Sequence, residues 1–156
     1  MAEEWLIDGY NLLHAIASGR SSQKKSRGAL LAMSAGFAAL KAERMLVVLD
    51  GMGDEAEPDV YRTEFFRVVY SQKVSADAVL ERQLFDRRAE AHFTVVTNDR
   101  AIANSARGSG ARVLSADVFM QRIEESRKES SETQHRNKFR SHGFHRPFED
   151  KLKDPE

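Results

Sequence analysis

Four aspartates stand where a predicted strand gives way to a loop or a helix: Asp8, Asp50, Asp77 and Asp99. In a chain of alternating strands and helices, such positions fall on one edge of the sheet, where ligands bind beyond the carboxyl ends of the strands. Carboxylates gathered there repel one another unless a cation lies between them. Mg²⁺ or Mn²⁺ would satisfy that requirement, and a metal held by carboxylates can hydrolyse a phosphodiester. The pattern therefore indicates metal-dependent phosphodiester chemistry.

Each aspartate also has a structural explanation. Asp77 lies in the first turn of a predicted helix, where a negative charge favours the helix dipole. Asp99 can be only a helix cap, and Asp50 can be only part of a turn. Asp8 is harder to explain in this way, because a charged residue at the end of a buried strand costs stability unless it is paired. The four signals are weak singly and stronger together.

Polar neighbours extend this candidate site. Asn11 could hold Asp8 or bind a phosphate, and a local turn bond explains it equally well. Thr97 and Asn98 could bond the scissile phosphate or a water molecule. Several basic residues could attract a nucleic-acid backbone, although a solvated helix start explains most of them nearly as well. These basic residues are Arg20, Lys24, Lys25, Arg27 and Arg100.

Apolar patterns predict the elements that would position these side chains. Strands are predicted at residues 4–8, 45–50, 65–70, 93–97 and 112–114. Helical spacing is predicted at residues 12–17, 23–44, from 75 onward, 98–107 and 115–125. In the helix that Ser75 caps, Val79, Leu80, Leu84 and Phe85 are expected to form the buried side. This alternation predicts an α/β fold with a parallel, helix-covered sheet.

Composition sets broad limits. The 156 residues predict one domain at residues 1–126, followed by a flexible polar tail at 127–156 that is basic between residues 135 and 146. A formal net charge of zero argues against a strongly basic coating protein but not against a nuclease. The absence of cysteine and of a signal-like N-terminus suits the cytoplasm. The apolar runs are too short to span a bilayer, so no membrane partner is expected.

Three motifs resemble the NYN-domain family, in its YacP-like branch of bacterial ribonucleases related to PIN-domain nucleases. They are Asp8-Gly9-Tyr10-Asn11, Ser75-Ala76-Asp77-x-x-Leu80-Glu81 and Val95-Val96-Thr97-Asn98-Asp99. The resemblance covers residues 4–125. It departs at Ser75, where threonine is common, and in the tail, which matches no family motif.

The resemblance implies a PIN-like three-layer α/β/α sandwich with a central, mostly parallel five-stranded sheet. It also implies a metal-dependent endoribonuclease whose site contains Asp8, Asp77 and Asp99, with Asn11 nearby and with Asp50 in a less firmly assigned role. Mg²⁺ or Mn²⁺ is the implied cofactor. RNA, in particular messenger RNA, is the implied substrate, and the ribosome is a candidate partner.

Two other interpretations stay open at this point. One is a catalytically silent RNA-binding or ribosome-binding module, which retention of the aspartates disfavours. The other is a receiver-like domain, which also gathers acids at a sheet edge. That domain would need paired acids after the first strand and a lysine after the fifth, where the chain has Leu114-Ser115-Ala116.

Overall fold

A parallel sheet forms the centre of the fold. The computed structural model describes residues 3–18, 27–41, 43–52, 62–87 and 92–142. Within these residues the sheet has five strands in the order β3-β2-β1-β4-β5, and each pair of neighbours is parallel. The strands are β1 (Glu4–Asp8), β2 (Arg44–Leu49), β3 (Phe66–Tyr70), β4 (Phe93–Val96) and β5 (Arg112–Leu114). The predicted α/β class with five strands is confirmed.

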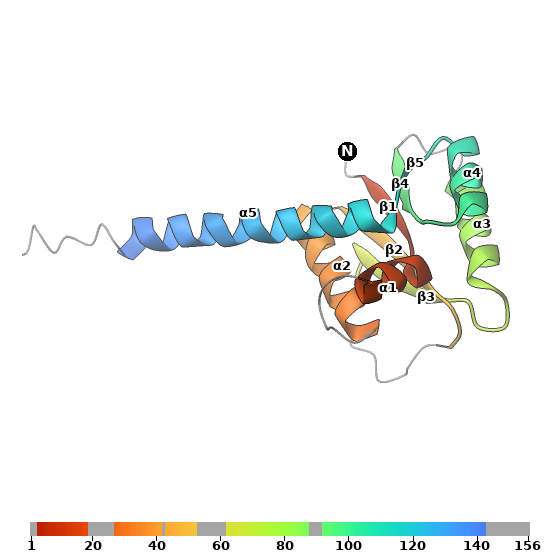
Figure 1. Cartoon of the computed structure of the whole chain (residues 1–156), viewed down its shortest axis with the longest axis horizontal. Helices are drawn as coiled ribbons and strands as arrows, with labels where there is room; N and C mark the ends of the chain where they lie inside the picture. The colour runs from red at the N-terminus through yellow and green to blue at the C-terminus, as the bar shows by residue number, and fades with distance from the viewer. Residues whose placement is uncertain (1–2, 19–26, 42, 53–61, 88–91, 143–156) are drawn as a thin grey trace, which may run out of the picture. The chain divides into compact units, whose positions relative to one another are not determined.

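Helices cover both faces of this sheet, which gives three layers (Figure 1). On β1, Trp5 and Ile7 face a cluster that includes residues of α1, α2 and the start of α5. Leu6, between them in sequence, faces the other cluster, to which α3 and α4 contribute. Because both faces are covered, the central strands are continuous apolar runs. The helices are α1 (Gly9–Ser18), α2 (Arg27–Lys41), α3 (Ala76–Arg87), α4 (Arg100–Gly108) and α5 (Ala116–His142).

The central position of β1 decides where the aspartates meet. Leu6 on β1 pairs with Leu46 of β2 on one side and with Val95 of β4 on the other. The chain moves outward from β1 through β2 to β3, then returns to the opposite side of β1 as β4. An open parallel sheet binds ligands at such a reversal of strand order. Asp8 therefore ends its strand next to the loop that follows β4.

Predicted helix caps fix the residues around this edge. The Oγ of Ser75 accepts the backbone N–H of Ala78 at 3.1 Å, so Ser75 caps α3. Asp99 caps α4 through its side chain, and the Oγ of Ser115 accepts the N–H of Val118 at the start of α5. The capping predictions for these three helix starts are confirmed.

Some predicted boundaries and contacts are wrong. The helix predicted to reach residue 44 ends at Lys41, and Arg44 already belongs to β2, where it pairs with Glu4 of β1. Phe85 was expected to be buried, but it is 60% exposed. Leu80 and Leu84, four residues apart, define the side of α3 that is buried, and the next residue along a helix points about 100° away from that line.

The last helix is longer than predicted. It was expected to end near Glu125, yet α5 continues to His142, so residues 127–142 are helical rather than without secondary structure. No proline or glycine interrupts the sequence before Gly143, and Glu132 and Arg136 have the spacing that supports a solvated helix. By its contacts the chain divides into Met1–Ile123 and Glu124–Glu156, and each unit is considered by itself. None of the helices described combines the length and apolarity needed to cross a bilayer.

Candidate functional site

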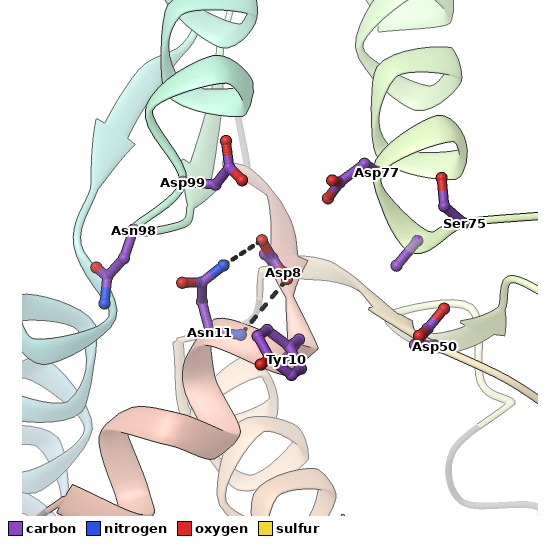
Figure 2. Close-up of a pocket in the computed structure, with 9 residues that line it drawn as sticks. Asp8, Tyr10, Asn11, Asp50, Ser75, Asp77, Asn98 and Asp99 are labelled. Carbon is purple, nitrogen blue, oxygen red and sulfur yellow. Dashed lines mark hydrogen bonds between the residues drawn. The ribbon is translucent and has the colours of Figure 1, made fainter.

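A pocket of about 310 Å³ opens at the carboxyl edge of the sheet (Figure 2). All four of the predicted aspartates line it, although they come from four different parts of the chain. The tight turn from β1 into α1 supplies part of its wall, and the N-termini of α3 and α4 supply another part. The lining residues are Asp8, Tyr10, Asn11, Asp50, Ser75, Ala76, Asp77, Asn98 and Asp99.

Asp8 is the buried acid of this pocket, with 3% of its surface exposed. Its Oδ2 accepts two side-chain hydrogen bonds, from Nδ2 of Asn11 at 2.5 Å and from Oγ1 of Thr97 at 2.9 Å. Its Oδ1 accepts only a long bond, 3.5 Å, from the backbone N–H of Asn11 among the described residues. Asp8 is therefore held firmly by one oxygen, while the other has capacity for a further partner.

The electrostatics of Asp8 set opposing effects against each other. Burial raises the pKa of Asp8 above its ordinary value, and the negative charge of Asp77 raises it further. The hydrogen bonds from Asn11 and Thr97 lower the pKa, because they favour the ionised form, but burial outweighs them. A cation close to both carboxylates would reverse the repulsion between them.

Thr97 links Asp8 to the loop that carries Asp99. Its hydroxyl donates to Asp8 and accepts the backbone N–H of Asp99 at 3.1 Å. Nδ2 of Asn11 lies 3.5 Å from the same hydroxyl. Asn11 and Thr97 thus orient the aspartates, and for Asn11 this matches the predicted contact with Asp8.

Asp77 and Asp99 bring carboxylate groups to the same pocket. Oδ1 of Asp99 accepts the N–H groups of Ala101 and Ile102 at 2.8 and 3.1 Å, which leaves its Oδ2 without a hydrogen bond from any described residue. Asp77 lies in the first turn of α3 and is exposed. Figure 2 shows the carboxyl groups of Asp8, Asp77 and Asp99 around a shared opening.

Asp50 and Asn98 line the pocket but also have structural partners. Oδ1 of Asp50 accepts the hydroxyl of Ser71 at 2.9 Å, and the Oγ of Ser71 accepts the N–H of Gly51 at 3.0 Å. Oδ1 of Asn98 accepts the N–H of Ala116 at 2.9 Å, so Asn98 helps to start α5. Figure 2 shows both residues set back from the three facing carboxylates.

The donor set suits a hard divalent cation. Among the described residues, no three Asp, Glu or His side chains lie close enough together to form a metal site with all ligands in direct contact. Mg²⁺ usually keeps several waters and binds through one or two carboxylates. Asp8, Asp77 and Asp99 line one pocket without forming such a site, so an ion there would be held partly through water.

Neither of the predicted basic residues that the structure describes lines the pocket itself. Arg27 begins α2, and its guanidinium carbon lies 5.5 Å from the centre of the Tyr70 ring, outside the pocket lining. Arg100 is the first residue of α4 and lines a neighbouring groove. Arg20, Lys24 and Lys25 lie outside the described residues.

Some contributions were not predicted from the sequence. The partnership of Ser71 with Asp50 joins residues 21 positions apart, and no local pattern signals it. Tyr10 also lines the pocket with its side chain 58% exposed. A large aromatic residue directly after the Asp8-Gly9 turn was an available signal for it.

Comparison with known proteins identifies relatives of this fold. The family model for the YacP-like NYN domain matches residues 5–155. The crystal structure of Rae1 (YacP) from Bacillus subtilis is similar with a TM-score of 0.67 and 20% identity, covering 97% of this chain and 91% of that chain. The crystal structure of a tryptophan-to-leucine mutant of the same protein is similar with a TM-score of 0.66 and 19% identity, covering 90% of this chain and 85% of that chain. At this identity the likeness shows the fold. No curated protein matches the chain.

Proposed function

Because the chain belongs to the YacP-like NYN domain family, we propose that it is a metal-dependent endoribonuclease that hydrolyses RNA phosphodiester bonds. The observation that carries this proposal is the convergence of Asp8, Asp77 and Asp99 on one pocket at the reversal point of a parallel sheet. The family match also removes support for a receiver-like domain.

Asp8, Asp77 and Asp99 are the residues that would hold Mg²⁺ or Mn²⁺, with Asp50 at the margin of the pocket. When bound, the ion supplies positive charge that stabilises the negative charge developing on the phosphodiester in the transition state. Asn11 and Thr97 keep Asp8 oriented and favour its ionised form. A water molecule is the proposed nucleophile, so no covalent enzyme intermediate is needed.

The pocket rim supports an unpaired nucleic acid as the substrate. The exposed ring of Tyr10 packs against His14 with 4.4 Å between ring centres, at an interplanar angle of 69°. Aromatic side chains beside a backbone-binding site stack on unpaired bases without selecting a particular sequence. Messenger RNA as the substrate and the ribosome as a partner are part of the proposal through the family resemblance alone. A cytoplasmic location is part of it because the sequence contains no cysteine.

The test compares two aspartates of the same helix. Asp77 lines the pocket, whereas Asp86 is exposed on α3 and does not. Purified wild type, Asp77→Asn and Asp86→Asn are incubated with labelled single-stranded RNA, with Mn²⁺ and with EDTA. We expect Asp77→Asn to lose about 100-fold or more in cleavage rate, while its circular dichroism and most of its RNA affinity are kept.

The same assay decides the alternative. Cleavage by Asp77→Asn at the wild-type rate would place the activity in another site or in a contaminating nuclease. Tight RNA binding by wild type with no cleavage in Mg²⁺ or Mn²⁺ would favour the catalytically silent RNA-binding module. Asp86→Asn is expected to match wild type throughout.

A further inference from the structure

One face of α4 carries a polar stripe that the fold does not use. Arg100, Asn104 and Arg107 follow one another at intervals of four and three residues, which places them on the same side of the helix. All three are exposed, while Ile102 and Ala106 form the buried side. Arg100 and Arg107 are about 10 Å apart along the helix axis, at about 1.5 Å per residue.

This stripe forms one wall of a groove of about 610 Å³. Val113 and Ser115, at and after β5, also line this groove. None of the residues described as lining the groove is an Asp or a Glu. Neither Arg100 nor Arg107 forms an ion pair with any residue in the described ranges, in contrast to Arg87, which is 2.7 Å from Glu4. In a chain with zero net charge, this groove is locally cationic.

The groove adjoins the pocket of aspartates. Asn98 lines both, and the consecutive residues Asn98, Asp99 and Arg100 carry the wall from one into the other. Figure 2 draws Asn98 at the side of the pocket opposite Asp50. A strand of RNA with one phosphate at the aspartates can therefore continue past Asn98 toward α4.

We propose that this groove binds the RNA backbone beside the scissile phosphate, with Arg100 and Arg107 contacting phosphates on that one side of the cleavage position. This inference rests on the proposed function. A guanidinium presents a fork of N–H donors that matches a phosphate. The separation of the two arginines exceeds the size of a single phosphate, so the groove takes a stretch of backbone rather than one free ion. The arginines act in substrate binding and not in the chemical step.

The experiment measures binding separately from cleavage. Full-length wild type, Arg107→Ala and a control, Arg82→Ala, are titrated with single-stranded RNA in EDTA across a salt series. Arg82 is exposed on α3 and lines neither the pocket nor the groove. A set of RNAs carries one neutral methylphosphonate each, at successive positions along the strand. Steady-state cleavage in Mn²⁺ is measured with the same three proteins.

We expect Arg107→Ala to weaken binding about 3- to 10-fold at low salt, because Arg107 is exposed and a solvent-exposed charge pair contributes little. The slope of log affinity against log salt should become shallower by about 0.7. Neutralising one particular phosphate, on one side of the mapped cleavage position, should weaken wild type by a similar factor and leave Arg107→Ala unaffected. In cleavage, KM should rise while kcat stays within about twofold.

Other outcomes overturn the proposal. It fails if Arg107→Ala and Arg82→Ala give the same affinity and salt slope. It also fails if every neutral phosphate weakens Arg107→Ala as much as wild type, because the side chain then contacts none of them. If one neutral phosphate weakens RNA binding by wild type but not by Arg107→Ala, and no RNA is cleaved, the backbone-binding groove is supported and the proposed endoribonuclease activity is refuted.

Discussion

Replacing Thr97 with valine removes a buried hydroxyl while preserving the shape of the side chain. Thr97 is 3% exposed, and its Oγ1 donates to Asp8 at 2.9 Å and accepts the N–H of Asp99 at 3.1 Å. Valine can make neither bond and creates almost no cavity. Asp8 would keep the side-chain bond from Asn11, and the N–H of Asp99 would need another acceptor.

The expected size of the effect follows from these two bonds. A hydrogen bond to a charged group contributes about 1.5–3 kcal/mol. The second bond joins two neutral groups, so its loss costs about 0.5–1 kcal/mol. We therefore expect the free energy of unfolding to fall by about 2–4 kcal/mol at neutral pH, measured by urea denaturation without divalent cations.

The pH dependence gives a sharper test. Burial raises the pKa of Asp8 in the folded protein above the ordinary value. Protonated Asp8 thus holds its proton more tightly in the folded protein than in the unfolded chain. The contribution of this proton to the free energy of unfolding is fully present below the unfolded pKa of Asp8 and is lost as pH rises through its folded pKa. Thr97→Val removes a bond that lowers the folded pKa of Asp8, so that pKa rises further. The loss of stability should be largest at neutral pH and should shrink as Asp8 becomes protonated.

Activity should report the same change. If catalysis needs ionised Asp8, the acid limb of kcat/KM moves to higher pH in Thr97→Val. A bond worth about 1.5 kcal/mol corresponds to about a tenfold further loss on the acid limb beyond any loss on the plateau. Thr97→Ser keeps the hydroxyl and is the matched control, expected to follow the wild-type pH profile. Equal acid limbs for Thr97→Val and wild type would refute the role of this hydroxyl in holding Asp8 ionised.

Two further substitutions probe the turn after β1 and the cation site. Gly9→Ala would place a Cβ 2.7 Å from the backbone oxygen of Val48, so we expect a loss of about 1–3 kcal/mol in urea denaturation. The control Gly36→Ala places its Cβ in open space within α2 and should not destabilise the protein. Equal free energies of unfolding for Gly9→Ala and Gly36→Ala would contradict the predicted clash at Gly9. Asp8→Asn should abolish Mn²⁺ binding measured by calorimetry, and wild-type affinity in this variant would remove Asp8 from the cation site.

Much of the edge that carries the site could be predicted, because strand ends and helix starts leave local signals. Asp8 follows a short apolar run, and Asp99 precedes a helix with polar and apolar sides. The order of the strands leaves no such local signal, because it depends on which apolar faces pack together across the whole chain. Only that order, with β1 between β2 and β4, shows that Asp8 and Asp99 adjoin one pocket.

The incorrect predictions arise where packing across the chain, or the lack of an apolar stripe, decides the structure. Phe85 has the apolar character of a core residue, but the direction of α3 is set by Leu80 and Leu84. The length of α5 was underestimated because residues after Glu125 lack an apolar stripe, which is the signal that reveals most helices. A helix can also continue through polar sequence when good helix-forming residues follow one another without proline or glycine.

The position of Asp8 explains why its neighbours are polar in an otherwise apolar interior. A carboxylate at this depth is costly when ionised, and the charge of Asp77 adds to the cost. Asn11 and Thr97 offset part of it by donating to a single oxygen, which leaves the other oxygen available. Fully satisfying Asp8 with protein donors would make the fold more stable but would occupy that oxygen. A core built only for stability would not leave the Oδ1 of Asp8 with a single long hydrogen bond. A divalent cation bound there would supply the missing partner.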